Sequence, residues 1–327
     1  MSYRLKSSEA LSKTIKRIAH EQIEASIDVL SQASYGNHDK GVHQARKHFK
    51  KMRSLVRLVE GDIGTKAYKR ESACFRDAGH QLEALRDSQV RLQAFDALLS
   101  HYTEFVESDS FDDIRQVLLE EYTAVHDTSG SDRDIATKVI PALRRANHRV
   151  DRWNISDRWS ALEYGLYKQY ARGYRAFDTV TQQPSPENLH DWRKRVKDLW
   201  CHLRLLSPLW PPLLKAWSNQ AKTLSELLGD DHDLAVLRTY LMDDPTQFSD
   251  DASQLGVLLS LIRRRQIELQ TAAVALGHRL YGESPKALAK RMRQYWRAWR
   301  TEGKRAKTVP PSSLDGQALS RLDSLRA

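Results

Sequence analysis

A run of basic residues between His43 and Arg57 carries the strongest chemical signal in the chain. It holds two histidines and six lysines or arginines, with no acidic residue among them. Arginine donates paired hydrogen bonds to phosphate oxygens, and lysine supplies a mobile positive charge. Two interpretations compete: an ordinary helix surface that faces water, or a binding site for a strongly negative ligand.

Helical spacing places most of these basic residues on one stripe. A helix turns by about 100° per residue, so residues at spacings of three and four fall within an arc of roughly 80°. The stripe consists of His43, Arg46, Lys50, Arg53 and Arg57. Apolar residues such as Phe49 and Val56 occupy the neighbouring arc, whereas a solvated stripe normally lies opposite the core. Because like charges on one helix face repel each other, the pattern favours a bound anion.

The second half of the chain repeats this pattern. LHDWRKRVKDLWCHLRLL, from Leu189, aligns with VHQARKHFKKMRSLVRLV, from Val42. Further on, LRDSQV from Leu85 resembles DHDLAV from Asp231 at an offset that agrees to within one residue. Two matches at one spacing predict a duplicated helical unit. The second stripe consists of His190, Arg193, Lys197 and Arg204 and is one charge poorer, because Trp200 takes the position of Arg53.

Long helices are needed to present such stripes, and the sequence predicts them throughout. Apolar residues recur at three- and four-residue spacing, and no convincing stretch alternates with period two. We therefore expect an all-α protein. Turn and cap residues predict breaks near Gly36, at 60–65, from 107, from 127, at 181–188, at 207–212 and from 243.

Composition narrows the class of protein. The net charge is +10 and the pI is near 9.5, which suggests a polyanionic partner. Two cysteines, Cys74 and Cys201, exclude a disulfide scaffold and a four-thiolate zinc site, and we interpret both as buried fillers in a reducing compartment. The first residues lack the apolar core of a signal peptide, and no apolar run is long enough to span a membrane. We expect a soluble protein in the cytoplasm.

Other basic residues form a secondary set of candidates. They lie near the N-terminus, on the first predicted helix of the second unit, and in a late basic run: Lys13, Lys16, Arg17, His20, Lys168, Arg172 and Arg264. Lys47 and Lys194 lie about 60° to 80° from the two stripes and are weaker members of the main set.

The doubled pattern of a histidine, an arginine three residues later and a lysine seven later resembles the CHAD family, the conserved histidine α-helical domain. The resemblance implies two pseudo-symmetric helical bundles whose basic residues line a central groove or pore that binds inorganic polyphosphate. It covers residues 4–300, with a first repeat at about 4–130, a connecting helix at about 132–153, a second repeat at about 157–300 and a loose tail at 308–327. The ExExK signature of a CYTH domain is absent, so the chain is similar to stand-alone members.

Carried over by position, the resemblance assigns polyphosphate binding to both stripes together with Lys47 and Lys194. It implies no catalysis and no cofactor, with polyphosphate granules as a candidate location. Other polyanions, such as sulfate, phosphate or nucleic acid, would bind without specificity. His43 and His190, placed among positive charges, should be neutral in the empty site. A bound polyanion reverses that effect, so we expect affinity to rise as the pH falls from about 8 to 6.

Three alternatives stay open. Eight tryptophans and twelve tyrosines could stack on single-stranded nucleic acid, although Trp192, Trp200, Trp210 and Trp217 fit helical packing. Residues 229–234, GDDHDL, and the His190–Asp191 pair are similar to metal-dependent HD phosphohydrolases, with His80 and His126 as further ligands. The competing interpretation has Asp230 capping a helix and Asp233 paired with an arginine. A basic helix surface on anionic lipid is the third alternative, which we expect least.

Overall fold

A computed structural model of the chain describes residues 3–33, 38–82, 84–105, 109–127, 132–248 and 252–308. Within these ranges, the side chains of residues 33, 38–40, 84–87, 125–127, 132–137, 252 and 304–308 are not described. All regular structure in the described residues is helical, without a strand, which confirms the all-α class. The predicted tail lies outside the described residues beyond Thr308.

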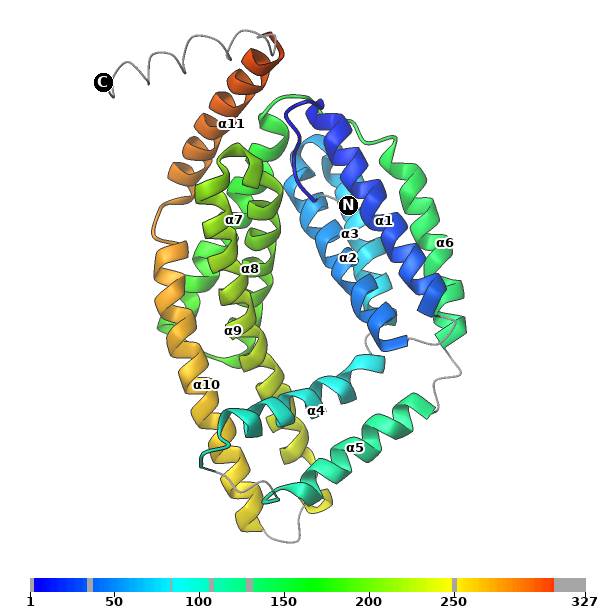
Figure 1. Ribbon diagram of the computed structural model, residues 1–327, viewed down its shortest axis with the longest axis vertical. Coiled ribbons are helices and arrows are strands. Elements are labelled where there is room, and N and C mark those ends of the chain that lie inside the picture. The colour runs from blue at the N-terminus through cyan, green and yellow to red at the C-terminus, as the bar shows by residue number, and fades with distance from the viewer. Residues whose placement is uncertain are drawn as a thin grey trace, which may run out of the picture.

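Four helices form one bundle, coloured blue, cyan and green in Figure 1. They are α1 (Leu11–Ala33), α2 (His38–Leu58), α3 (Glu60–Gln81) and α6 (Asp132–Val150). The apolar stripes predicted from the sequence face inward here. Ile15 and Ile18 of α1 pack in the same core as Phe49 and Met52 of α2, each at most 2% exposed. Burial of these side chains supplies most of the stability of such amphipathic helices.

A second group of helices lies beside the first bundle. It contains α7 (Ser160–Gln182), α8 (Pro186–Leu206), α9 (Pro211–Asp243), α10 (Ala252–Leu280) and α11 (Pro285–Thr308). Ser185 caps α8 by accepting a hydrogen bond from the backbone N–H of Asn188 at 3.2 Å, and Pro186 occupies the first turn. Pro211 likewise opens α9, since proline lacks only an N–H that a helix start leaves unused.

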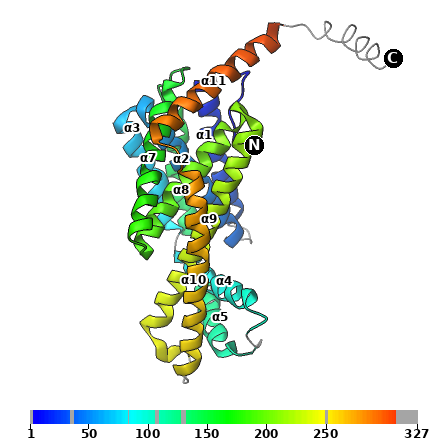
Figure 2. The same cartoon turned by 90° about the vertical axis from the view of Figure 1, so that its left-hand side faces the viewer.

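Helices α4 (Ala84–His101) and α5 (Asp112–Asp127) leave the first bundle and pack across the far ends of α9 and α10 (Figures 1 and 2). They build a second hydrophobic core there. Phe95 of α4 and Ile114 of α5 pack with Leu237 of α9 and Ile262 of α10, all fully buried. Helices from both halves of the chain therefore share each core.

The two groups of helices meet where α2 packs on α7 and α8. Gly165 of α7 allows the closest approach, because a Cβ atom there would lie 2.0 Å from the carbonyl oxygen of Leu58. Only a residue without a side chain fits such a contact. Leu55 of α2 and Leu203 of α8 belong to the same buried core at this junction.

The break predicted at 60–65 is confirmed: α2 ends at Leu58, α3 begins at Glu60, and Gly64 interrupts α3 with φ at 80°. Two other sequence-based expectations were wrong in detail. Asp230 does not cap a helix, because α9 continues through it. Trp210 does not pack in the core: it is 48% exposed and meets Tyr295 edge to face.

Candidate anion-binding site

The C-terminal ends of the two basic stripes come together where α2 meets α8. Ser54 Oγ donates a hydrogen bond to the carbonyl of Asp198 at 3.4 Å, and His202 Nε2 donates to the carbonyl of Ser54 at 3.0 Å. Burial lowers the pKa of His202, so the ring is a neutral donor in this contact. The junction fixes the two stripes relative to each other.

Two arginines pair with one buried carboxylate on one side of this junction, and the charges of all three act on two further arginines. Arg57 Nη1 of α2 donates to Asp198 Oδ1 at 2.8 Å, and Arg195 Nη1 of α8 lies 3.8 Å from Asp198 Oδ2. Arg53 of α2 and Arg172 of α7 are electrostatically coupled to the same three residues. We call Arg53, Arg57, Arg172 and Arg195 with Asp198 the arginine cluster. Arg195 also pairs with Asp191 at 3.3 Å at the edge of the cluster. Four guanidinium groups with one carboxylate among them leave the arginine cluster positively charged.

The guanidinium groups of the arginine cluster repel one another, and burial removes part of their hydration. Burial and the charge of Arg57 lower the pKa of Arg53, and burial with Arg195 and Arg57 lowers that of Arg172. Burial also lowers the pKa of Arg57, but Asp198 more than offsets this and raises it overall. Within the described part of the chain, the buried Nε atoms of Arg53 and Arg195 have no hydrogen-bond acceptor. An anion would relieve the repulsion and use donors of this kind.

The N-terminal part of the α8 stripe lies against α9. The His190 ring stacks on His232 with centroids 4.4 Å apart, and Arg193 Nη2 lies 3.8 Å from Asp233 Oδ1. Gly229 makes room for this guanidinium, because a Cβ atom there would lie 3.2 Å from Arg193 Nη2. This pairing confirms the expected contact between Asp233 and an arginine.

Charge and burial keep His190 neutral. Burial, His232 and the nearby Lys194, Arg193 and Lys197 lower its pKa to about 4. Burial would raise the pKa of Asp233, but the hydrogen bond from His232 and the charge of Arg193 lower it overall. His190 is thus an uncharged ring in a positive field, as the sequence predicted.

The N-terminal part of the α2 stripe lies against the C-terminal end of α3. Arg46 Nη1 donates to the carbonyls of Gly79 at 3.1 Å and Leu82 at 3.0 Å. The last carbonyls of a helix lack partners within it, so a guanidinium is well placed there. His43 is half-buried on the same helix, while Lys47 and Lys50 are exposed.

A different set of groups occupies the other side of the α2–α8 junction. The Arg204 guanidinium lies over the rings of Trp200, at 5.5 Å, and Tyr3, at 5.9 Å. Lys51 of α2 lies nearby, and burial together with the charge of Arg204 lowers its pKa. Trp200 is partly buried against the main core and offers its face to Arg204, so packing accounts for the tryptophan at this position.

Comparison with known families decides the relationship of this chain. The CHAD domain profile matches residues 17–242, more than half of the chain, and no CYTH domain is found. The chain belongs to the CHAD domain family. No curated protein matches its sequence.

Sequence reasoning missed several charged residues of this CHAD domain. Arg195, Asp198 and Lys51 lie off the two stripes by helical angle. Asp198 pairs with Arg57 across the junction and with Arg195 on its own helix, and the charge of Arg204 acts on Lys51 across it. Arg76 of α3 also acts on Arg53. Their alternation with stripe residues along α2 and α8 was visible, but only the packing of two helices shows which of them turn toward the cluster.

Of the secondary candidates, only Arg172 joins the arginine cluster. The α1 candidates have partners inside their own bundle. Lys16 Nζ donates to the carbonyl of Asp151 at 2.9 Å, and His20 contacts Asn147 and Asp151. Lys13 is exposed.

The remaining secondary candidates are also paired. Arg17 bonds to Glu9 at 3.0 Å and Glu21 at 2.9 Å. Lys168 donates to Glu60. Arg264 lies far along α10, 3.5 Å from Glu268 and over the ring of Tyr102. These contacts give each charge a local structural role.

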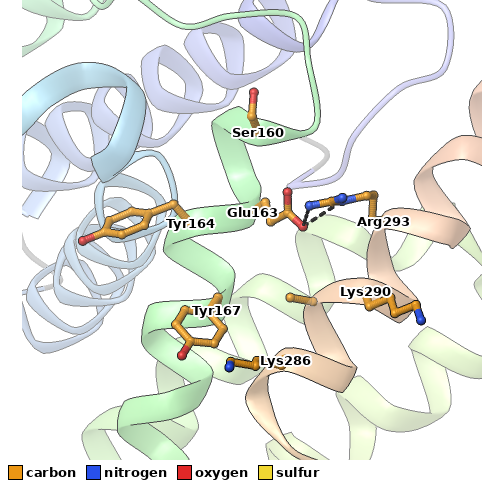
Figure 3. Close-up of a pocket in the computed structure, with 8 residues that line it drawn as sticks. Ser160, Glu163, Tyr164, Tyr167, Lys286, Lys290 and Arg293 are labelled. Carbon is orange, nitrogen blue, oxygen red and sulfur yellow. Dashed lines mark hydrogen bonds and ion pairs between the residues drawn. The ribbon is translucent and has the colours of Figure 1, made fainter.

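A basic groove of about 420 Å³ lies between α7 and α11 (Figure 3). Tyr167 and Lys286 lie close together along it, whereas Tyr164 points away from α11. Glu163 of α7 pairs with Arg293 of α11, which links the two helices and neutralises part of the charge. The groove is separate from both stripes, and α11 lies outside the matched range of the CHAD domain.

The structure also shows where the residues of the alternative interpretations lie. Among the described residues, no three His, Cys, Asp or Glu side chains gather as a metal site would require. His80 is exposed on α3, and the side chain of His126 lies outside the described set. No described helix is both long and apolar enough to cross a membrane. Cys201 is buried and Cys74 half-buried, and burial raises the pKa of both thiols.

Proposed function

We propose that this CHAD domain binds inorganic polyphosphate without transforming it, along the basic residues of α2 and α8. CHAD domains are polyphosphate-binding modules at the level of the family. The observation that carries the proposal is the arginine cluster, where Arg57 and Arg195 pair with Asp198 and the charges of these residues act on two further arginines from α2 and α7. A linear phosphate polymer presents repeated negative charge and has no bases. A site for it therefore needs closely spaced hydrogen-bond donors and no groups that recognise base edges.

The proposed ligand residues keep the assignment made from the sequence, with additions from the packing. They are His43, Arg46, Lys47, Lys50, Arg53, Arg57, His190, Arg193, Lys194, Lys197 and Arg204. Arg172 and Arg195 join them through the arginine cluster. We propose that the stripes line a central basic groove between two pseudo-symmetric units.

We also propose that the functional unit extends from about residue 4 to about 300. Two observations support the extension beyond the matched range. Leu5 N donates to the carbonyl of Leu205 at 3.0 Å, which ties the N-terminal segment to α8. Leu276 of α10 and Met292 of α11 belong to the same main core as α2 and α8.

The test is a titration with long-chain polyphosphate beside single-stranded RNA of the same number of phosphates, at two salt concentrations. We expect polyphosphate to bind more tightly at both, and to displace RNA when the two compete. The exposed tyrosines Tyr164, Tyr167 and Tyr174 favour RNA as the competing ligand. Tighter binding of RNA, or RNA that resists displacement, would overturn the proposal.

Hydrolysis is the other outcome to examine. Phosphate released from polyphosphate in the presence of Mg²⁺ or Mn²⁺, and not without them, would show metal-dependent catalysis. We expect none.

A further inference from the structure

Two arginines at corresponding positions of the repeat have neighbours of opposite charge. In the register that aligns His43 with His190, Arg57 corresponds to Arg204, and Lys51 corresponds to Asp198. Arg57 forms a 2.8 Å ion pair with Asp198, whereas Arg204 acts on the positive Lys51. The two sides of the α2–α8 junction are therefore matched in position and opposed in charge.

Asp198 occupies guanidinium donors that a phosphate group could also use. Its carboxylate side chain is 4% exposed, and it contacts Arg57 through one oxygen and approaches Arg195 with the other. Carboxylate and phosphate oxygens compete for the same guanidinium donors. Because Oδ2 accepts no hydrogen bond from any described group, the carboxylate is only partly engaged. A buried charge in this state is held by few interactions.

Among the described residues, no acid forms an ion pair with Lys51 or Arg204 on the opposite side. Burial and the charge of Arg204 together lower the pKa of Lys51. The Tyr3 hydroxyl donates to the backbone carbonyl of Lys51 at 3.3 Å, and the Arg204 guanidinium lies over the rings of Tyr3 and Trp200, so Tyr3 contacts both basic residues. An arriving anion would gain more here, since it would displace no ion pair between described residues.

We infer that Asp198 is an internal counter-anion that competes with phosphate for Arg57 and Arg195, so that Lys51 and Arg204 form the stronger anchor for the ligand. The inference rests on the proposed function and gives its binding site a direction, with a shielded side and an unshielded side. It also assigns binding to Lys51, which lies off the stripes. Asp198 stabilises the empty cluster and weakens its hold on the ligand.

The first experiment replaces the carboxylate by its neutral isostere, Asp198→Asn, and titrates long-chain polyphosphate. We expect binding roughly three- to tenfold tighter, because a competing charge-assisted hydrogen bond is removed. The control Glu120→Gln makes the same change of charge on an exposed residue of α5 and should change affinity less than about twofold. Unchanged or weaker binding by Asp198→Asn would overturn the inference.

The second experiment uses pairs, because Asp198→Asn leaves Arg57 partly buried and unpaired, which can prevent folding. Arg57→Gln with Asp198→Asn removes both members of the shielded pair. Lys51→Gln with Arg204→Gln removes both members of the unshielded one. Because Arg57 is a shielded ligand, we expect the first double variant to lose some affinity and the second to lose at least about fivefold more than the first. Equal losses in the two would contradict the inference.

The failure of the proposed function is separable from this result. If the parent protein does not bind long-chain polyphosphate, thermal unfolding with inorganic tripolyphosphate still tests Asp198. We expect tripolyphosphate to raise the melting temperature of Asp198→Asn more than that of the parent. An equal or smaller rise would show that the carboxylate does not compete with phosphate.

Discussion

The behaviour of His190 follows from what surrounds it. Its ring is stacked on His232 and lies in the field of Arg193, Lys194 and Lys197, so protonation of the empty site adds one more charge to a positive surface. A bound polyanion turns that repulsion into attraction. The histidine is therefore a group whose charge follows the ligand.

The pH dependence of binding has a definite sign. The pKa of His190 is about 4 in the empty protein, against an ordinary value of 6.5, and a bound polyanion raises it. Binding then takes up a proton between the two values, so affinity increases as the pH falls below the bound-state pKa and levels off only near pH 4. Titrations with long-chain polyphosphate at pH 7, 6 and 5 check this. A parent protein that binds no more tightly at pH 5 than His190→Gln would contradict it.

Arg193 offers a direct test of one ligand contact. Arg193→Ala removes a partly buried guanidinium that lies 3.8 Å from Asp233 Oδ1, so we expect polyphosphate affinity to fall about tenfold or more. Arg17→Ala removes the same charge from α1, where Glu9 and Glu21 already hold it, and should cost less than about twofold. Isothermal titration of both variants decides, and equal losses would show that Arg193 contributes only net charge.

Helical periodicity predicts which basic residues share a stripe, but it does not predict which residues they contact. Periodicity placed His43 and Arg46 on one face of a helix because side-chain direction is fixed by local geometry. Arg195 and Asp198 could not be found in this way, because their role depends on the angle at which α2 and α8 meet. That angle is set by buried contacts between residues far apart in the chain.

At the scale of the elements, close packing of helices positions the cluster. α7 brings Arg172 to the cluster because Gly165 lets its backbone approach the end of α2. That approach brings Arg172 within reach of the charges of Arg57, Arg195 and Asp198. The glycine is thus part of the binding architecture although it carries no donor.

Gly165→Ala should be strongly destabilising. A methyl group would lie 2.0 Å from the carbonyl oxygen of Leu58, and backbone atoms on both sides leave no flexible group to move aside. We expect the free energy of unfolding to fall by about 3 kcal/mol. Urea denaturation measures it. Gly256→Ala on α10 is the matched control, because its Cβ would meet nothing within 4 Å, and we expect it to stabilise the protein by about 0.5–1 kcal/mol.

Element boundaries were predictable where cap and turn residues announce them. Ser185 and Pro186 mark the start of α8 in both the sequence and the structure. The glycines and acids at 60–65 correctly predicted the end of α2, but they did not show that α3 begins within them, where Glu60 and Asp62 are favourable in the first turn. A single glycine with positive φ, Gly64, absorbs the bend.

At the scale of the whole molecule, local patterns did not predict that α4 and α5 pack on helices of the second half of the chain. Both helices belong to the first half of the chain, but their apolar faces are buried against α9 and α10. Periodicity shows that a face is buried without showing against what. The two halves are therefore joined through both cores, and the stripes of α2 and α8 are held in one packed body.

Salt should weaken binding steeply and in proportion to ligand length. Each neutralised phosphate releases condensed counterions, so the slope of log affinity against log salt counts the contacts. We expect a slope of about −5 or steeper for long-chain polyphosphate and a clearly smaller one for tripolyphosphate, which reaches fewer groups. Fluorescence titrations between 50 and ~300 mM salt provide the slopes. Equal slopes for the two ligands would contradict an extended site.

The central claim is tested most directly by removing four stripe residues together, with Arg46, Lys50, Arg193 and Lys197 all replaced by alanine. The control removes four exposed charges from α11, at Lys286, Lys290, Arg293 and Arg297. Titration with long-chain polyphosphate, with the helical signal recorded in circular dichroism, should show that the stripe variant stays folded and loses binding while the control binds nearly as the parent does. Equal binding by the two variants would contradict the account.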